Sequence, residues 1–287
     1  MDGLILIDKP KGITSQTVCN IVKRKLNIKK AGHNGTLDPN TTGIMVVATG
    51  QATKCLKLIN EHDKEYIATI IFGYDSDTLD MDTENITEYS EDTSLEDIKL
   101  AMDKIKAYKS QIPPMTSSIK INGKKLYEYQ RANQEVEIKS RDVTLYDYEI
   151  VSDIREYNGH KEIDIRVSTS KGYYVRAMAR DLGKELGIHA ILHELRRTKA
   201  GDYNVKDAIP LDDLTEKDVK SITQFFDFPK VEVKDYMRNL VLNGAFLDER
   251  QTHQNGVFYV TNNCDIIAIY EEVDHLKYKP LLIFNWK

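Results

Sequence analysis

A carboxylate in a turn-forming segment is the first candidate for chemistry in this chain. Asp38 stands before a proline in the segment 31–43, which reads AGHNGTLDPNTTG. A glycine-rich turn followed by Asp-Pro can hold one carboxylate at a fixed place, where it serves as a nucleophile or a base. An ordinary turn or helix cap explains the same residue types. Since no other carboxylate is fixed nearby in the sequence, a glycosidase with paired carboxylates is not indicated.

Two ring side chains and one arginine could act with this carboxylate. His33 lies in the same segment and could contact a substrate, although a solvent-exposed loop histidine is the more common case. Tyr66 begins the strand-like run KEYIATI, where its ring could stack on a base or belong to the core. Arg176 follows the strand-breaking sequence SKG, in the first turn of a predicted helix. A partly buried arginine there requires an anionic partner, and Asp38 is a candidate.

The charge distribution is compatible with nucleic-acid binding, although the net charge is −5. Residues 75–103 carry eleven Asp and Glu against one Lys, whereas residues 104–141 carry nine Lys and Arg against three acidic residues. Residues 1–50 and 171–201 are also locally basic. Phosphate binding needs a local positive patch and not a positive total. Solvated faces of mixed sign explain the same counts.

The cysteine count and the hydropathy pattern exclude several classes of protein. Cys19, Cys55 and Cys264 form no CxxC pair, which is typical of free thiols in a reducing cytoplasm. No apolar run approaches about 18 residues, so we expect no membrane span. The first residues lack the features of a signal peptide, and we expect a cytoplasmic protein. The sequence has no HxH, HExxH or Cys/His grouping, so we also expect no metal.

The hydropathy pattern predicts strands and helices in irregular alternation. Strands are expected over residues 4–7, 44–49, 65–72 and 162–168, and helices over 15–28, 95–105, 175–186 and 234–242. Residues 31–43 are expected to form a long loop and the acidic residues 75–92 a surface loop.

The irregular alternation is typical of an α+β fold with a mixed, largely antiparallel sheet flanked by helices. Short β-rich runs after about residue 230 predict a small appendage, too small for a large core of its own. We therefore predict two domains, one over residues 1–230 and one over residues 231–287.

Six motifs, in order, resemble those of the bacterial tRNA pseudouridine-55 synthases of the TruB type. The resemblance runs from residue 3 to about residue 202 and is loose beyond residue 230. The motifs are GLILIDKPKGITS, AGHNGTLDPNTTGIMVVATGQATK, KEYIATIIFGYDSDTLD, QIPPMTSSIKINGKKLYEYQR, SKGYYVRAMARDLG and LHELRRTKAG. The resemblance implies the pseudouridine synthase catalytic fold, followed by a C-terminal PUA-like RNA-binding domain that is short here.

The resemblance also implies an activity. Such an enzyme isomerises uridine-55 in the T-arm (the TΨC loop) of tRNA to pseudouridine, without a cofactor or a metal. The target base lies inside a folded loop and must be flipped out of it. We expect a monomer that needs no protein partner, and we expect residues 75–92 to lie away from the RNA.

Three catalytic roles follow from the resemblance. Asp38 would be the catalytic aspartate, and it stays open whether this carboxylate acts as a nucleophile or removes a proton from the sugar. Tyr66 would stack on the target uracil and serve in proton transfer at C5. Arg176 would pair with Asp38, orient it and keep it ionised.

The resemblance also assigns substrate-binding and supporting residues. His33 would lie near the flipped bases and help to open the T-loop. Tyr174 and Leu195 would line the uridine pocket. Lys9 and Pro10 would support the active-site loop.

A tRNA-binding or RNA-folding module without chemistry is a second hypothesis for the same basic face. Binding alone does not require a loop carboxylate. The joint presence of Asp38, His33, Tyr66 and Arg176 therefore favours the enzyme.

Overall fold

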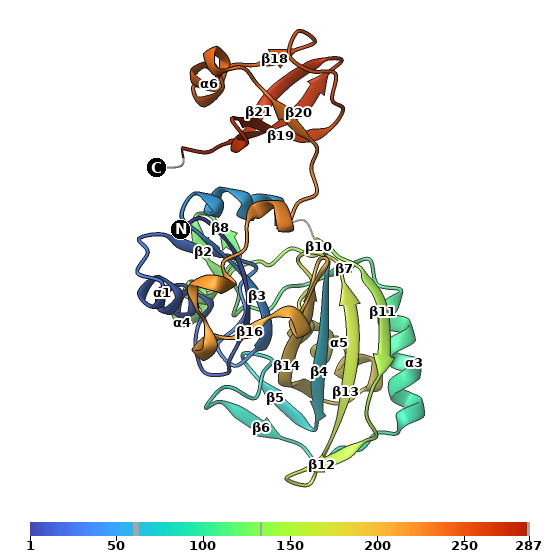
Figure 1. The fold of residues 1–287 in the computed structure, drawn as a ribbon. Helices are drawn as coiled ribbons and strands as arrows, with labels where there is room; N and C mark the ends of the chain where they lie inside the picture. The colour runs from blue at the N-terminus through green and yellow to red at the C-terminus, as the bar shows by residue number, and fades with distance from the viewer. Residues whose placement is uncertain (60–62, 133, 286–287) are drawn as a thin grey trace.

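The computed structural model describes residues 1–59, 63–132 and 134–285, which form two parts with separate sheets (Figure 1). Within these residues the main sheet has ten strands. Its central path runs β11 (Leu145–Ile150), β13 (His160–Thr169), β4 (Lys64–Phe72), β14 (Ala190–Ala200), β3 (Thr42–Thr49), β1 (Gly3–Lys9) and β16 (Ile209–Pro210). Three strands lie off this path, namely β2 (Ala31–Asn34), β12 (Arg155–Tyr157) and β15 (Tyr203–Asn204).

Neighbouring strands of this path are antiparallel, except that β14 runs parallel to β3 and β1 runs parallel to β16. The parallel contact of β14 with β3 is short and pairs Arg196 with Thr42 and Arg197 with Gly43. At this joint the half of the sheet formed by β11, β13 and β4 meets the half formed by β3 and β1. The predicted mixed, largely antiparallel sheet is confirmed.

The helices are α1 (Ser15–Lys25), α2 (Leu56–Ile59), α3 (Leu95–Lys106), α4 (Leu126–Arg131), α5 (Val175–Leu186) and α6 (Asp235–Leu242). The 3-10 helices are η1 (Gly50–Cys55), η2 (Val205–Asp207), η3 (Leu211–Asp213), η4 (Glu216–Asp218) and η5 (Ile222–Gln224). Short strand pairs join β5 (Tyr74–Ser76) to β6 (Ile86–Glu88), β7 (Ser110–Gln111) to β10 (Arg141–Asp142), and β8 (Lys120–Ile121) to β9 (Lys124–Lys125). No helix in the described ranges is long and apolar enough to cross a membrane.

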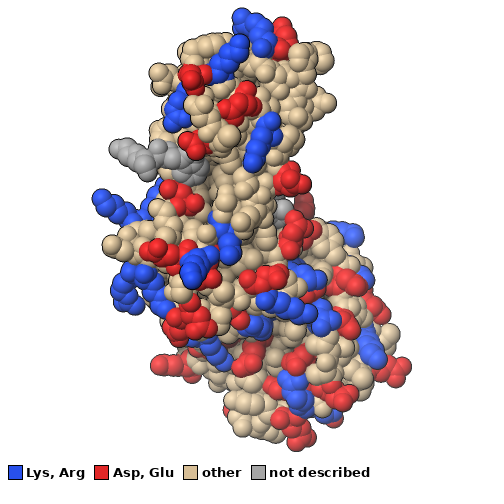
Figure 2. Space-filling view, in the orientation of Figure 1, with Lys and Arg blue, Asp and Glu red and all other residues tan. Residues whose placement is uncertain are grey.

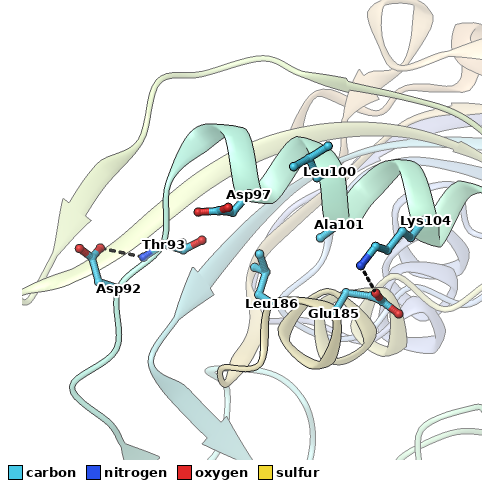
Figure 3. Close-up of a pocket in the computed structure, with 8 residues that line it drawn as sticks. All are labelled: Asp92, Thr93, Asp97, Leu100, Ala101, Lys104, Glu185 and Leu186. Atoms are coloured by element: carbon cyan, nitrogen blue, oxygen red, sulfur yellow. Dashed lines mark hydrogen bonds and ion pairs between the residues drawn. The ribbon is translucent and has the colours of Figure 1, made fainter.

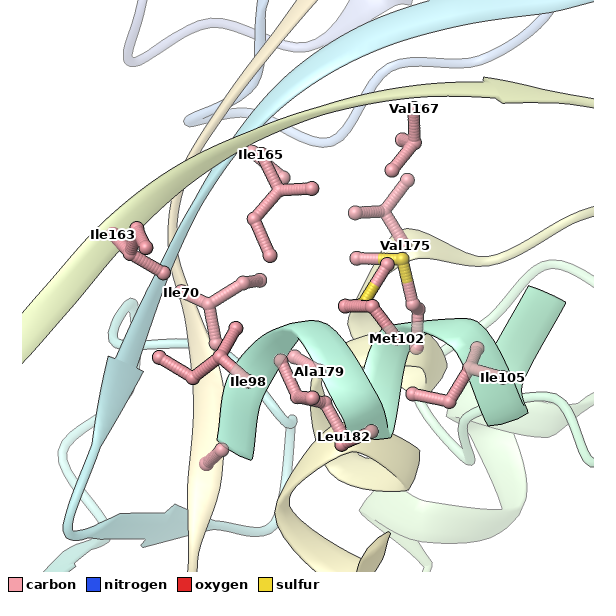
Figure 4. Close-up of a cluster of buried hydrophobic side chains, with 14 of the residues drawn as sticks. Ile70, Ile98, Met102, Ile105, Ile163, Ile165, Val167, Val175, Ala179 and Leu182 are labelled. Atoms are coloured by element: carbon pink, nitrogen blue, oxygen red, sulfur yellow. The ribbon is translucent and has the colours of Figure 1, made fainter. Parts of the chain in front are cut away.

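Helices α3 and α5 cover one face of the main sheet, and their apolar stripes form its core (Figure 4). The alternating residues Ile163, Ile165 and Val167 of β13 point toward Met102 of α3 and Leu182 of α5. Caps explain where α3 begins and where α5 ends. The Ser94 hydroxyl accepts a hydrogen bond from the Asp97 amide before α3, and Gly187 ends α5 in the left-handed conformation.

Helix α1 fixes the strands that flank the candidate site. The Thr14 side chain caps it by accepting a hydrogen bond from the Thr17 amide. Its apolar face packs on β1 and β3 in a second cluster, which includes Ile5, Ile7, Val18, Val22, Met45 and Val47. The helix ends at Lys25, three residues before the predicted end.

The C-terminal part is built on a five-stranded sheet, in the order β17 (Lys230–Glu232), β19 (Val257–Asn262), β20 (Asp265–Asp274), β21 (Lys277–Ile283) and β18 (Leu247–Asp248). The predicted β-rich character is confirmed. This part has an apolar cluster of its own around Phe258, Tyr270 and Tyr278. A further cluster joins the two parts. In it, side chains such as Ile269 and Phe284 pack with Val46 and other residues of the larger part.

Two predicted loops contain strands. Residues 31–34 form β2, which pairs with the outer half of β3, so the loop that carries Asp38 spans only residues 35–41. The glycine and asparagine content of residues 31–34 predicted a loop, because these residue types have a low propensity for strands. The strand is stabilised by its hydrogen bonds to β3. The acidic segment 75–92 likewise contains the β5–β6 pair.

Candidate active site

Asp38 and Arg176 form an ion pair with 2.9 Å between Oδ2 and Nη2. The aspartate lies in the loop between β2 and β3, and the arginine lies in the first turn of α5. The arginine side chain is 10% exposed and the aspartate side chain is 49% exposed. The carboxylate is therefore held on one side by a buried cation and is open to a substrate on the other. Asp38, the candidate anionic partner that the sequence offered for Arg176, is the residue that pairs with it in the structure.

Two further segments hold the Arg176 guanidinium. Its Nη1 donates to the carbonyl oxygen of Thr78 and to the hydroxyl of Thr116, both at 3.0 Å. Its Nη2 donates to the carbonyl oxygen of Thr116 at 2.8 Å. The planar fork of the guanidinium thus has a fixed orientation before any substrate arrives. The sequence pattern missed both threonines, because they lie in turn-rich or acidic stretches without periodicity.

The loop of residues 35–41 is tied to β1 and α1. The Lys9 ammonium group is fully buried and donates to the carbonyl oxygens of Pro10 and Pro39, both at 2.8 Å. Burial lowers the pKa of Lys9 to about 8, against the opposing effect of the nearby Asp38 charge. The buried Ser15 hydroxyl exchanges hydrogen bonds with the backbone of Leu37. Lys9 and Pro10 therefore lie directly behind the aspartate loop.

Asp80 is a second carboxylate beside the ion pair. Burial raises its pKa to about 6, against the lowering effects of a hydrogen bond from the Asp82 amide and of the Arg176 charge. Residues 78–80 therefore lie against Arg176 although they belong to the acidic segment 75–92. The segment was predicted to be a surface loop, and its sequence pattern does not distinguish Asp80 from the other acidic residues.

His33 on β2 and Tyr66 on β4 lie on the same side of β3, away from β1, and both interact with Arg197 of β14. Burial, followed by the charge of Arg197, lowers the pKa of His33 below 6.5. The His33 Nδ1 is buried and has no hydrogen-bond partner among the described residues. Tyr66 pairs directly across the strands with Arg197, so the two side chains share one face of the sheet. The His33 imidazole therefore has one ring nitrogen that is free to bind a further group.

Tyr174 and Leu195 flank the same region. Tyr174 precedes α5, and its backbone N–H and carbonyl oxygen are both bound by the side-chain amide of Gln111. Burial raises the pKa of the Tyr174 hydroxyl. Leu195 pairs with Ala68 on β14 and β4, two residues from the pair of Arg197 with Tyr66. Gln111 was not predicted, and it fixes the start of the helix that carries Arg176.

The basic segment 104–141 forms a cluster of aromatic and cationic side chains around α4. Lys124 lies over the Tyr129 ring at 4.7 Å from the centroid, and Lys125 and Arg131 lie over the Tyr127 ring at 5.4 Å. Figure 2 shows one face of the molecule, where basic and acidic side chains are interspersed and do not form a continuous patch of one sign.

Two pockets lie apart from Asp38. The first, of about 240 Å³, lies between the beginning of α3 and the end of α5 and is lined by residues such as Asp97 and Leu186 (Figure 3). An ion pair of 3.1 Å between Lys104 and Glu185 forms part of its wall. The second, of about 440 Å³, lies at the β5–β6 pair. None of the predicted site residues lines either pocket.

Polar side chains of the site are engaged in hydrogen bonds and in the Asp38–Arg176 ion pair. In the part of the chain that the structure describes, no three His, Cys, Asp or Glu side chains are grouped so that they could hold a metal ion. One half-exposed carboxylate, its arginine partner and the neighbouring polar rings are groups that can take part in acid–base chemistry.

Comparison with solved structures shows that chains of two solved complexes share this fold. The chain superposes on a chain of the "Structure of H/ACA RNP bound to a substrate RNA containing 2'-deoxyuridine" with a TM-score of 0.68 and 22% identity, covering 99% of this chain and 85% of the other. A chain of the "Crystal Structure of a Cbf5-Nop10-Gar1 Complex" gives a TM-score of 0.67 and 24% identity, with coverage of 99% and 84%.

Comparison with sequences extends the resemblance to nearly the whole chain. A protein of Caldanaerobacter subterraneus subsp. tengcongensis named tRNA pseudouridine synthase B is 34% identical over 99% of both chains. An Acholeplasma laidlawii protein of the same name is 35% identical, covering 99% of this chain and 100% of the relative. The similarity thus includes the residues after 230, where the motifs alone gave only a loose resemblance.

Two family models match adjacent regions of the chain, which together span residues 23–242. Residues 23–175 match the model of the TruB family pseudouridylate synthase N-terminal domain, and residues 176–242 match that of the tRNA pseudouridylate synthase B C-terminal domain. The first model ends at the residue before Arg176, so the two members of the ion pair lie in different matched regions. These matches and the full-length relatives establish that the chain belongs to the TruB family of pseudouridylate synthases.

Proposed function

We propose that this protein isomerises uridine-55 in the T-arm of tRNA to pseudouridine, with Asp38 as the catalytic aspartate. The observation that carries the proposal is the Asp38–Arg176 ion pair, in which a half-exposed carboxylate is oriented by a nearly buried guanidinium. Family membership supports the substrate, because the relatives are named tRNA pseudouridine synthase B.

The reaction breaks the bond between C1′ of the ribose and N1 of uracil and forms a bond between C1′ and C5. N1 gains a proton and C5 loses one, so no redox step and no co-substrate is needed. The ionised Asp38 acts at the sugar, either by attacking C1′ or by removing a proton from C2′. Arg176 orients the carboxylate in both routes, and Tyr66 serves in proton transfer at C5.

The substrate uridine must leave its stack to reach the carboxylate, at a cost of a few kcal/mol. Stacking on an aromatic ring returns about 1–3 kcal/mol per base. Tyr66 supplies this ring, Tyr174 and Leu195 line the uridine pocket, and His33 contacts the opened loop. The neutral state and the unpartnered nitrogen of His33 support such a contact, because it can hydrogen-bond without adding charge. Lys9 and Pro10 support the aspartate loop.

The C-terminal residues 231–287 act as a small PUA-like RNA-binding domain attached to a catalytic domain of residues 1–230. The separate five-stranded sheet supports this division. The protein works as a cytoplasmic monomer on tRNA, without a cofactor, a metal or a protein partner.

The test is a modification assay on an unmodified tRNA transcript. The wild type is expected to convert one T-arm uridine to pseudouridine, detected by release of tritium from C5, because the two nucleosides have the same mass. The Asp38→Asn variant is expected to be inactive and to bind tRNA within about tenfold of the wild type, because phosphate contacts dominate affinity. The exposed Asp82→Asn variant is the matched control for loss of a carboxylate.

A protein that binds tRNA tightly and leaves the transcript unchanged would instead be a binding module. Loss of tRNA binding by a folded Asp38→Asn variant would contradict the catalytic role of Asp38.

A further inference from the structure

Arg197 is a buried arginine for which the proposed chemistry has no direct use. Its side chain belongs to the largest fully buried side chains of the protein, and the residue is 2% exposed. A buried guanidinium normally has a carboxylate partner, because an unpaired buried charge is costly. The ion pairs of the described residues include none to Arg197, although the adjacent Arg196 pairs with Asp8 at 2.7 Å.

The partners of Arg197 are neutral groups from three different segments. Its Nε donates to the carbonyl oxygen of Ile44 on β3 at 2.8 Å. Its Nη1 and Nη2 both lie 3.4 Å from the carbonyl oxygen of Gly35, the first residue of the aspartate loop. On its other side, Arg197 stands directly opposite Tyr66 across the β14–β4 ladder. The guanidinium therefore bridges the joint between the two halves of the sheet.

The absence of a side chain at Gly35 allows the Arg197 guanidinium to approach its backbone closely. A Cβ atom at Gly35 would lie 3.1 Å from Nη1 of Arg197, so the guanidinium packs against the backbone where the loop begins. Burial lowers the pKa of Arg197, and the charge of the Tyr66 hydroxyl group and its side-chain hydrogen bond to Arg197 oppose this effect. A lysine at position 197 would retain the charge and lose the fork that reaches two segments at once.

We propose that Arg197 is a positioning residue that holds the Tyr66 side chain and the beginning of the Asp38 loop in one fixed arrangement. The inference rests on the proposed function, which assigns roles in the isomerisation to both Tyr66 and Asp38. Arg197 itself touches no substrate and acts through these two groups. A small displacement of reacting groups is enough to cost about a hundredfold in rate.

The test is a double-mutant cycle of Arg197→Lys with Tyr66→Phe, read as single-turnover rates on a tRNA transcript. Arg197→Lys is expected to lower the rate constant by about tenfold to a hundredfold, with little change in the Kd for tRNA. In the Tyr66→Phe background the same substitution is expected to cost at least about threefold less, because the hydroxyl through which it acts is gone. Arg196→Lys, on the same strand, is the matched control and is expected to stay near the wild-type rate.

A second readout does not depend on activity. Hydrogen exchange of the amides of residues 35–41 is expected to be faster in Arg197→Lys than in the wild type and unchanged in Arg196→Lys, at a temperature where all variants are folded. Arg197→Met, which removes the buried charge, keeps the test informative if the lysine variant folds poorly.

Additive effects in the cycle would overturn the proposal, and so would wild-type exchange of residues 35–41 in both variants at position 197. A wild-type protein that forms no pseudouridine would defeat the proposed function alone, since the exchange measurement would still decide whether Arg197 holds the loop.

Discussion

The carboxylate of Asp38 and the guanidinium of Arg176 meet at 2.9 Å, although one lies in a loop between strands and the other opens a helix far along the chain. The arginine is held from behind by Thr78 and Thr116, so its orientation does not depend on the aspartate alone. The site is therefore preorganised, with the aspartate half-exposed and the arginine buried.

Replacing Arg176 with lysine tests whether orientation matters beyond charge. A lysine keeps the positive charge and cannot contact Asp38, Thr78 and Thr116 together. Losing one hydrogen bond to a charged group costs about 1.5–3 kcal/mol, so we expect kcat to fall about tenfold to more than a hundredfold with a smaller change in KM. Steady-state kinetics on a tRNA transcript measure this. Equal losses for Arg176→Lys and the exposed Lys104→Ala would show a nonspecific effect.

The raised pKa of Asp80 predicts that the free energy of unfolding depends on pH. Its folded-state pKa of about 6 lies above the ordinary value of 3.8, so the native state binds more protons between these values. Its contribution to stability is therefore present at low pH and is lost as the pH rises through 6. We expect the stability gain of Asp80→Asn over the wild type to be larger at pH 8 than at pH 4, by at most about 3 kcal/mol. Urea unfolding at both pH values measures the difference, with the exposed Asp75→Asn as the control that shows no such change.

Lys9 should matter more for turnover than for folding. Its buried ammonium group links Pro10 to Pro39, and methionine would fill the space without this link. We expect Lys9→Met to lose at least about tenfold in kcat while remaining folded. Because the folded-state pKa is lowered to about 8, the stability of the wild type relative to this variant should rise between pH 8 and 10.5. The exposed Lys11→Met variant should retain its activity, and similar losses in both variants would contradict this role.

Gly43 is the residue that lets β14 approach β3. It has a φ of +107°, and a Cβ atom there would lie 2.2 Å from the carbonyl oxygen of Arg197. We expect Gly43→Ala to cost about 2–5 kcal/mol in the free energy of unfolding, from left-handed strain and overpacking together. Gly159→Ala has a φ of +82° with open space around it and should cost only about 1–2 kcal/mol. Equal costs in urea unfolding would show that the close approach of the two strands is unimportant.

Local sequence patterns determined much of this protein. Apolar periodicity predicted α3 and α5 with their boundaries, because this pattern reports which face of a single element is buried. The turn-rich segment around Asp38 and the arginine at the start of α5 marked the two residues that form the ion pair. The motif order indicated the family to which the chain belongs.

The tertiary structure alone decided which distant groups meet. Thr78, Asp80 and Thr116 reach Arg176 from segments whose polar composition is typical of any surface loop. The strand β2 exists because β3 offers it hydrogen bonds, and Arg197 is buried because Gly43 lets two strands close over it. Such contacts depend on the packing of segments far apart in the chain, and no periodicity within one segment encodes them.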